Sequence, residues 1–254
     1  MNRRSVLEGF ALDYDRMVDW RKRLAIEGPF LRKLFSKHAV RSLLEGACGP
    51  GHHAIYLSSF IERVRAFDID GEMLQLARGY SSQAKAKVRF FLADFLNFPR
   101  KANGVFDAFL CLGNSFAHLQ GRKDLRRVLA NVARVLKPEG LAVIHLINFE
   151  LMLGEGPGVR FVSPRLITEK GLTTAYVKFF VVNDRRIGVH FVKLLIRREG
   201  ISQETHSGEL TAFKKDDILA AAKGLFRRRE LFGDYDFSRY VRKTSPQMIL
   251  VARK

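Results

Sequence analysis

Three groups of residues follow short apolar runs, in an order that points to a single binding site. The first is the glycine-rich Glu45-Gly46-Ala47-Cys48-Gly49-Pro50-Gly51, and the second and third are Asp68 and Asp94. Glycine has no Cβ and lets the backbone approach a ligand closely. Carboxylates accept hydrogen bonds from hydroxyl and amino groups. The three groups together could therefore hold a ligand that carries both kinds of donor.

The spacing of these residues narrows the kind of ligand. Each group alone has a simpler interpretation, because the glycines suit a tight turn, Asp68 a solvated strand end and Asp94 a turn. Their joint occurrence at consecutive strand ends predicts a site for a sulfonium cofactor with a ribose and an adenine. Asp68 would accept the ribose hydroxyls, and Asp94 would read the adenine. The glycine pattern differs from the Gly-x-Gly-x-x-Gly of dinucleotide binders, so we expect no pyrophosphate there.

Alternating apolar runs and helical periodicities predict the elements that position these residues. A helix-prone N-terminal segment covers about 10–38. Short strands are expected at 42–45, 63–68, 87–92, 105–112 and 141–147, with helices at 71–78 and 123–137 and a stop at Pro138-Glu139-Gly140. A helix at 216–223 and an antiparallel pair of strands at 231–234 and 247–252 would end the chain. Parallel strands need crossover helices. The sequence therefore predicts an α/β fold, a doubly wound, Rossmann-like, mostly parallel seven-stranded sheet with an antiparallel edge.

The pattern changes after Asn148. Runs at 172–182 and 187–196 are typical of strands joined by a hairpin turn at Asn183-Asp184-Arg185-Arg186, and 206–213 could add a third strand. We expect an antiparallel β insertion that forms a lid on the acceptor side. The predicted organisation is 1–148 for the N-terminal helical segment and the cofactor-binding core, 149–213 for the lid, and 214–254 for the return to the core sheet.

These motifs resemble those of class I S-adenosylmethionine-dependent methyltransferases. The resemblance rests on residues 45–51, on Phe67-Asp68-Ile69-Asp70-Gly71-Glu72-Met73-Leu74 and on Ala93-Asp94-Phe95. It covers about residues 10–150 well and the remainder loosely. Residues 106–119, Phe-Asp-Ala-Phe-Leu-Cys-Leu-Gly-Asn-Ser-Phe-Ala-His-Leu, are similar, nearly residue for residue, to a stretch of glycine N-methyltransferases. That branch also includes bacterial glycine and sarcosine methyltransferases.

The resemblance implies roles for individual residues. Ala47 would present backbone to the methionine part of the cofactor, Asp68 would hold the ribose, and Asp94 with Phe95 would bind and flank the adenine. Leu112 would offer its carbonyl to the cofactor's ammonium, and Arg23, or Arg21 in another register, would pair with its carboxylate. The expected cofactor-binding set is Arg23, Glu45, Gly46, Ala47, Gly49, Gly51, Asp68, Ile69, Asp94, Phe95, Leu112, Ser115 and His118.

The acceptor side is expected to use His118, Tyr14 and Asn114 as catalytic residues. His118 would face the methionine end of the cofactor, and Asn114 and Ser115 match positions beside the acceptor. His118 could equally start a helix, Tyr14 could be a core aromatic residue, and Arg23 could be a solvated charge. We expect Cys48 and Cys111 to be small buried residues, because methyl transfer needs no covalent enzyme intermediate. No metal site is expected.

The chain also departs from the resembling enzymes on the acceptor side. Ile147 stands where glycine methyltransferases carry an arginine for the acceptor's carboxylate. Two acceptor-site tyrosines are replaced near Phe161-Val162 and near Phe191. A carboxylate left without a counter-charge would cost several kcal/mol to bury. We therefore expect glycine to be a poor acceptor and a larger or less anionic amine to be preferred, unless a lid arginine such as Arg160, Arg185 or Arg186 substitutes.

The composition limits the remaining function classes. The chain of 254 residues is 47% apolar, carries a formal net charge of +18 and has two cysteines, too few for a disulfide framework. Glu8 and Asp13 interrupt the apolar run that a signal peptide would need, so a cytoplasmic protein without a membrane partner is expected. The basic residues are spread along the chain, which permits nucleic acid as a partner but does not favour it. No particular oligomeric state is predicted.

Together these features predict a methyltransferase that acts on a small-molecule acceptor, at an amine nitrogen. S-Adenosylmethionine would be the cofactor and S-adenosylhomocysteine the product. An RNA or protein methyltransferase using the basic surface is the alternative, and a cofactor-binding protein without activity is a third class.

Overall fold

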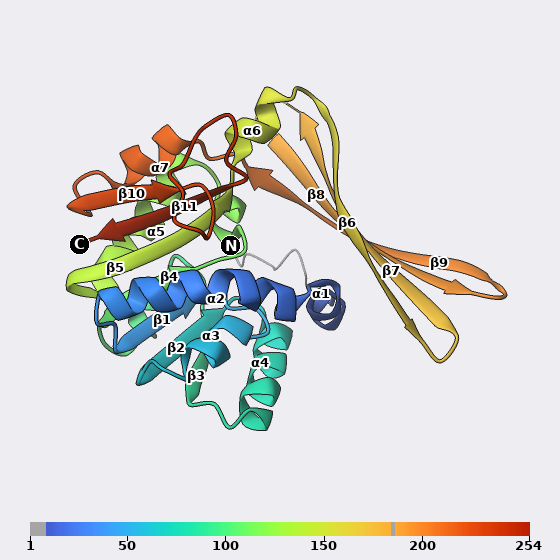
Figure 1. The fold of residues 1–254 in the computed structure, drawn as a ribbon, viewed down its shortest axis with the longest axis horizontal. Helices are drawn as coiled ribbons and strands as arrows, with labels where there is room; N and C mark the ends of the chain where they lie inside the picture. The colour runs from blue at the N-terminus through green and yellow to red at the C-terminus, as the bar shows by residue number, and fades with distance from the viewer. Residues whose placement is uncertain (1–8, 184–185) are drawn as a thin grey trace.

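The computed structural model describes residues 9–183 and 186–254, which fold into two β-sheets with helices around the larger one (Figure 1). The large sheet has seven strands in the order β10-β11-β5-β4-β1-β2-β3. Its strands are β1 (Ser42–Gly46), β2 (Arg63–Asp68), β3 (Val88–Leu92), β4 (Phe106–Cys111), β5 (Leu136–Ile147), β10 (Arg228–Phe232) and β11 (Gln247–Arg253).

The first five strands of the large sheet run parallel to one another, and β11 pairs antiparallel with both β5 and β10. The order of the parallel strands reverses at β1, because the chain moves outward from β1 through β2 to β3 and then returns to β4 on the other side. Ligands bind beyond the carboxyl ends of the strands at such a switch point. The predicted α/β class, with a mostly parallel seven-stranded sheet and an antiparallel edge, is confirmed.

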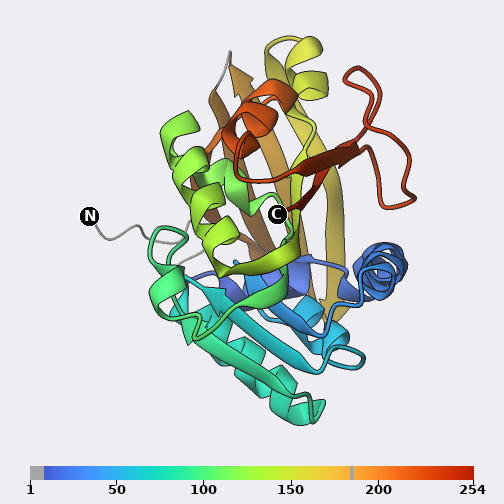
Figure 2. The same cartoon turned by 90° about the vertical axis from the view of Figure 1, so that its left-hand side faces the viewer.

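Helices cover both faces of the large sheet (Figure 2). The helices are α1 (Ala11–Met17), α2 (Trp20–Lys37), α3 (His52–Leu57), α4 (Gly71–Gln83), α5 (Arg122–Val135), α6 (Phe149–Gly154) and α7 (Lys215–Ala222), with short 3-10 turns η1 (Phe98–Arg100) and η2 (Ser115–His118). Neighbouring strand residues face opposite sides: Leu43 belongs to a core cluster that includes residues of α2, α3 and α4, whereas Leu44 belongs to one that includes residues of α5 and α7. Because both faces are covered, every residue of β1 is buried, and so is every residue of β4 except Asp107.

Two helix starts fix the loops that follow β1 and β2. Gly51 caps α3 with a φ of 80°, and a Cβ at this position would lie 2.9 Å from the Cβ of Ala77. Asp70 caps α4, where its carboxylate accepts hydrogen bonds from the backbone N–H groups of Glu72 and Met73. Such caps satisfy donors that the first helical turn leaves free. Both turns are thus determined by residues next to them in the sequence.

The residues Pro138-Glu139-Gly140, where the helix was predicted to stop, lie inside β5, and α5 ends before them. β5 begins at Leu136, directly after α5 ends at Val135. The pairing passes from Phe106 with Leu136 to Ala108 with Leu141, so the four residues 137–140 of β5 bulge opposite the single residue Asp107 of β4. Glu139 takes a positive φ of 63° within this bulge. The proline and glycine therefore mark an irregularity inside a strand.

The second sheet is an antiparallel insertion of four strands in the order β6-β7-β8-β9, one more than the sequence predicted. The strands are β6 (Gly158–Glu169), β7 (Leu172–Asn183), β8 (Arg186–Arg197) and β9 (Gly200–Thr211). β6 was missed because its register shifts between Val162 and Arg165, which interrupts the alternation. β9 is longer than predicted because its first residues are polar and exposed. Asp184 and Arg185 of the predicted hairpin turn lie outside the described residues.

Helix α1 contacts both the second sheet and two helices that cover the large sheet. From α1, Asp13 accepts hydrogen bonds from the Tyr176 hydroxyl at 2.7 Å and from Lys193 Nζ at 2.6 Å, both in the second sheet. Asp15 lies 2.8 Å from Nε2 of His52 in α3 and accepts a hydrogen bond from the Tyr80 hydroxyl in α4. The N-terminal segment is thereby fixed between the four-stranded sheet and the helices of the large sheet.

Candidate active site

A cavity of about 480 Å³ lies at the carboxyl ends of the parallel strands, between the two sheets. One side is formed by the loops after β1, β2, β3 and β4, and the other by β7, β8 and β9, with Tyr14 of α1 between them. Ten of the predicted site residues line it: Tyr14, Ala47, Gly49, Asp68, Ile69, Asp94, Phe95, Asn114, Ser115 and His118. The structure therefore brings most of the predicted site together in one place.

Asp68 is held in position by the backbone at the end of β2. Its carboxylate accepts hydrogen bonds from the N–H of Gly49 at 2.7 Å and from the N–H of Asp70 at 3.0 Å. Burial raises the pKa of Asp68 to about 6, although these two hydrogen bonds partly offset the effect. Each carboxylate oxygen can accept a second hydrogen bond. Asp68 can therefore still bind a pair of hydroxyl groups in the cavity.

Asp94 and Phe95 form the end of the cavity next to β3. The carboxylate of Asp94 accepts a hydrogen bond from the N–H of Leu96 at 2.7 Å, which fixes the turn after β3. The ring of Phe95 packs edge-on against Phe67 and Phe116, with centroid distances of 5.8 and 5.1 Å. The result is an apolar wall beside a hydrogen-bond acceptor, which suits a flat heteroaromatic group with an amino substituent.

Five predicted residues stand behind the cavity wall and do not line it: Arg23, Glu45, Gly46, Gly51 and Leu112. A Cβ on Gly46 would come within 2.7 Å of the Phe67 ring, so this glycine, like Gly51, is required by packing. The Leu112 carbonyl accepts a hydrogen bond from the Ser115 hydroxyl at 3.1 Å. These residues support the loops that do reach the cavity.

Arg23 belongs to a buried ionic network. Its Nε donates to Glu27 at 2.9 Å, and the other carboxylate oxygen of Glu27 lies 2.5 Å from Nε2 of His53. Burial opposes the ionisation of Glu27, but the hydrogen bond from His53 and the charge of Arg23 outweigh it and lower the pKa of Glu27 to about 2. Glu27 and His53 were not predicted as part of the site. The available signals were the four-residue, helical spacing of Glu27 from Arg23 and the position of His53 two residues after the glycine loop.

Arg23 also lies directly behind Gly113 of the cavity wall. Gly113 has a φ of 73°, and a Cβ at this position would lie 3.4 Å from Nη2 of Arg23. Nearby, Oε2 of Glu45 has no hydrogen-bond partner among the described residues. Burial raises the pKa of Glu45 to about 8, so Glu45 is protonated at neutral pH. The charge of Arg23 partly offsets this effect of burial on Glu45, so the guanidinium and the carboxyl group with its one unsatisfied oxygen belong to the same end of the site.

Lys178 and Phe191 line the side of the cavity formed by the second sheet, and His118 lies in η2, the turn after β4 that packs against β9. His118 is exposed to the cavity, and partial desolvation there, together with the charge of Lys178, lowers its pKa to about 4, so its imidazole is neutral at pH 7. Lys178 was not predicted. In β7 it shares a face with the buried Tyr176 and Phe180, and a lysine on an otherwise apolar face was the signal that could have identified it.

Asn114 fixes the relation between η2 and the end of β5. It adopts a left-handed conformation with a φ of 69°, and its side-chain oxygen accepts a hydrogen bond from the N–H of Ile147 at 3.0 Å. The Ile147 side chain does not line the cavity. Phe161 does not line it either, because 72% of its side chain is exposed on the outer face of the second sheet, where it contacts Phe179. The expectation that Phe161 belongs to the acceptor site is wrong.

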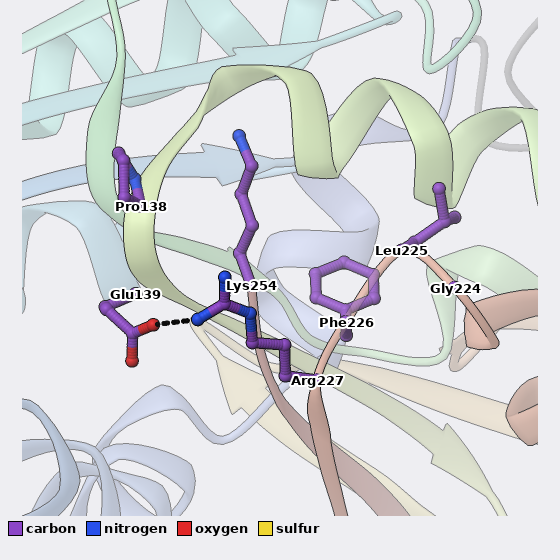
Figure 3. Close-up of a pocket in the computed structure, with 7 residues that line it drawn as sticks. All are labelled: Pro138, Glu139, Gly224, Leu225, Phe226, Arg227 and Lys254. Atoms are coloured by element: carbon purple, nitrogen blue, oxygen red, sulfur yellow. Dashed lines mark hydrogen bonds and ion pairs between the residues drawn. The ribbon is translucent and has the colours of Figure 1, made fainter.

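A second cavity, of about 410 Å³, lies where the bulge of β5 meets the C-terminal residue and the segment after α7 (Figure 3). Its charged residues are largely engaged with one another, since Glu139 binds Arg227 at 3.1 Å and Arg253 at 2.8 Å. Lys254 donates to the Leu136 carbonyl. This cavity contains none of the predicted site residues. Among the described helices, none is long and apolar enough to cross a membrane.

The part of the chain that forms the strand-end side of the larger cavity is similar to a known protein family. Residues 43–140 match a family described as "Methyltransferase domain". This part of the chain is similar to a methyltransferase domain. It includes the loops after β1, β2, β3 and β4, and therefore the whole strand-end side of the cavity. The resemblance to methyltransferases that the motifs indicated is confirmed.

Two curated relatives are N-methyltransferases. A glycine/sarcosine N-methyltransferase from Parasynechococcus marenigrum is 36% identical over 159 residues, 61% of this chain and 55% of the relative. A glycine N-methyltransferase from Homo sapiens is 29% identical over 245 residues, 85% of this chain and 80% of the relative. The chain spans about half the length of the first of these.

A solved structure shares the complete fold. An amino pentose methyltransferase from Micromonospora echinaspora, with S-adenosylmethionine bound, superposes with a TM-score of 0.72 at 20% identity, and the match covers 100% of both chains. The four-stranded insertion therefore belongs to a fold that known methyltransferases share.

Proposed function

We propose that the protein is an S-adenosylmethionine-dependent methyltransferase that methylates an amine nitrogen of a small molecule. The observation that carries this proposal is one continuous cavity with two chemically different sides. Asp68, Asp94 and Phe95 lie on the side of residues 43–140, Lys178 and Phe191 come from the second sheet, and His118 lies in η2, which packs against β9. An enclosed cavity of this size suits a cofactor and a small acceptor better than a nucleic acid or a folded protein.

The residues on the first side fit the proposed cofactor. Asp68 can accept the ribose hydroxyls, Asp94 can accept the adenine amino group, and Phe95 can flank its ring. Arg23 behind Gly113 can pair with the carboxylate of the methionine part, and the unsatisfied oxygen of Glu45 lies at the same end. S-Adenosylmethionine would supply a methyl group on a sulfonium, which is already activated for transfer.

The protein's own contribution would be alignment, exclusion of water and control of one proton. The second sheet and α1 enclose the acceptor, which holds the nucleophile in line with the methyl group. His118 is neutral at pH 7 and can accept a hydrogen bond from the acceptor's amine through a ring nitrogen. Burial raises the pKa of Tyr14, so its hydroxyl remains protonated and can orient the amine lone pair by donating to a neighbouring oxygen.

The names of the similar proteins support an amine as the acceptor. Two are named as glycine or sarcosine N-methyltransferases, and the third acts on an amino pentose. We propose that the insertion formed by 149–213 is the lid that selects the acceptor. Neither Arg160 nor Arg186 lines the cavity, and Arg160 is paired with Glu155 at 2.6 Å. Neither arginine therefore substitutes for the missing arginine at Ile147, and glycine is proposed to be a poor acceptor.

A panel of amines tests this proposal. Purified protein would be incubated with methyl-labelled S-adenosylmethionine and, separately, with glycine, sarcosine, larger amino acids and amino sugars, and the products would be identified by mass spectrometry. We expect N-methylation of a larger amine and slow turnover of glycine. Efficient methylation of glycine at millimolar concentration would contradict the assignment of the acceptor.

A further inference from the structure

Lys178 has an unusual environment for a lysine. It extends from the middle of β7 into the cavity, on the same face as the buried Tyr176 and Phe180. Its Nζ lies 5.1 Å from the ring centroid of Phe180 and 5.3 Å from that of Phe191. Lysine on an apolar face normally extends its ammonium group to bulk water. Here the ammonium group points into the enclosed space where the acceptor is proposed to bind.

No carboxylate among the described residues forms an ion pair with Lys178. Of the acids that line the cavity, Asp68 and Asp94 bind backbone N–H groups instead, and Glu209 is exposed at the outer edge. Lys193 on the neighbouring strand shows the usual arrangement, because its Nζ binds Asp13 at 2.6 Å and lies 3.7 Å from Glu204. Lys178 is thus a cation that the protein places in the cavity without supplying its partner.

The energetic consequence favours an anionic ligand. Enclosure by protein, together with the charge of Arg23, lowers the pKa of Lys178 to about 8, so the ammonium form still predominates at neutral pH. An enclosed charge without a partner is costly, and a hydrogen-bonded counter-ion removes much of that cost. The free energy gained when a ligand's carboxylate pairs with Lys178 should therefore be larger than the free energy gained at an exposed lysine.

We propose that Lys178 binds an anionic group, such as a carboxylate, on the methyl acceptor. This inference rests on the proposed function. It places the counter-charge on the lid and not after β5, where Ile147 stands. The preferred acceptor is then an amine larger than glycine, with an anionic group that reaches Lys178 on the lid and not the position of Ile147. This replaces the expectation of a less anionic amine, which assumed that the cavity has no free cation.

The anion could also come from the cofactor, whose carboxylate needs a cation at the same cavity. Two observations favour the acceptor. Arg23 already stands beside Gly113, on the side of the cavity where the cofactor is proposed to bind. Lys178 belongs to the second sheet and contacts Phe191, which faces it from β8. Arg23 and Lys178 repel each other. An arrangement in which Arg23 pairs with the cofactor's carboxylate and Lys178 pairs with the acceptor's anionic group is therefore more favourable than one in which both bind the same carboxylate.

Acetate provides a probe that needs no knowledge of the acceptor and no turnover. Its binding to the protein saturated with S-adenosylhomocysteine would be measured by ligand-observed NMR titration for the wild type, Lys178→Met, Lys178→Arg and Lys170→Met. Lys170 is the matched control, because it lies exposed in the hairpin between β6 and β7 of the same sheet and its replacement makes the same change in net charge. S-Adenosylhomocysteine affinity would be measured for each variant by calorimetry.

We expect acetate binding to weaken at least tenfold in Lys178→Met, to be largely kept in Lys178→Arg, and to be unchanged in Lys170→Met. S-Adenosylhomocysteine affinity should remain within about twofold in all three variants. Two results would overturn the inference: acetate binding that does not depend on Lys178, or a tenfold loss of S-adenosylhomocysteine affinity in Lys178→Met, which would assign Lys178 to the cofactor.

A failure of the proposed function would look different. If S-adenosylhomocysteine did not bind the wild-type protein at all, the cofactor assignment would be contradicted, and acetate titration of the ligand-free variants would still test Lys178. Carboxylate and amide pairs provide a second test with turnover. Glycine with glycinamide and β-alanine with β-alaninamide should show that Lys178→Met lowers any preference for the carboxylate member, and an unchanged preference would contradict the inference.

Discussion

The large sheet and the four-stranded insertion form the two sides of the same cavity by different physical means. On the side of the large sheet, adjacent residues fix each loop: Asp70 caps the helix after β2, and Gly51 caps the helix after β1. On the other side, Lys178, Phe191 and Leu210 come from three different strands and meet only when the sheet has formed. The loops on the proposed cofactor side are thus each fixed by residues next to them in the sequence, whereas the proposed acceptor side is assembled by the pairing of β7, β8 and β9.

The largest expected effect concerns the ionic network behind the cofactor side. Glu27→Gln would leave Arg23 without its charged partner, and removing one partner of a buried ion pair costs about 3 to 5 kcal/mol. Because the pKa of Glu27 is lowered from 4.5 to about 2, its contribution to stability is present above pH 4.5 and is lost as the pH falls toward 2. Urea unfolding at pH 7 and pH 3 measures this.

The difference in unfolding free energy between wild type and Glu27→Gln should accordingly shrink at pH 3. A difference that is the same at both pH values would mean that Glu27 acts through packing and not through its charge.

Asp68→Ala should weaken the binding of S-adenosylhomocysteine by about 1 to 3 kcal/mol, because it removes charge-assisted hydrogen bonds to the ribose. Calorimetry measures this change, and thermal unfolding checks that the variant is folded. NAD should not bind with comparable affinity to the wild type, since the glycine loop offers no pyrophosphate site. NAD binding as tight as that of S-adenosylhomocysteine would contradict the cofactor assignment.

Two phenylalanines of the insertion allow a matched test of the acceptor side. Phe191 is buried and lines the cavity, whereas Phe161 is exposed on the opposite face of the same sheet. Phe191→Ala should lower kcat/KM for the acceptor by about tenfold, since one truncated apolar contact is worth about 1 to 3 kcal/mol. It should leave S-adenosylhomocysteine affinity nearly unchanged, and Phe161→Ala should change neither quantity. If Phe191→Ala changed only cofactor binding, the two sides of the cavity would have to be reassigned.

The smallest expected effect is a pH dependence of cofactor binding. The pKa of Asp68 is raised to about 6 by burial, and only the ionised carboxylate accepts hydrogen bonds from both ribose hydroxyls. Binding should therefore be constant above pH 7 and weaken as the pH falls below 6, by up to about tenfold per pH unit. Titrations from pH 5 to 8 would show this for the wild type. A variant with Asp68→Asn should show a flatter profile, and an equally steep one would assign the titration to another group.

The contrast between the two sides also explains how much the sequence alone could predict. Asp68, Asp94 and the glycine loop were identifiable because each directly follows its own strand, and parallel strands bring such ends together. Phe161 was misplaced because the register shift between Val162 and Arg165 cannot be read from alternation. Lys178 was overlooked because its significance depends on what is absent around it in three dimensions.

Glu27 and His53 were missed for a similar reason. They lie 26 residues apart in the chain, and only the packing of α2 against α3 brings them within 2.5 Å. The roles of the individual site residues remain predictions that the variants above test.

The central claim, methyl transfer to a small amine, is tested most directly by supplying methyl-labelled S-adenosylmethionine and the purified protein to a cell extract. The extract would then be separated into small-molecule, RNA and protein fractions, with heat-inactivated protein as the control. We predict that the label enters the small-molecule fraction, in a product whose mass and fragmentation show an N-methyl group and an anionic group. Label that enters only RNA or protein would contradict this account.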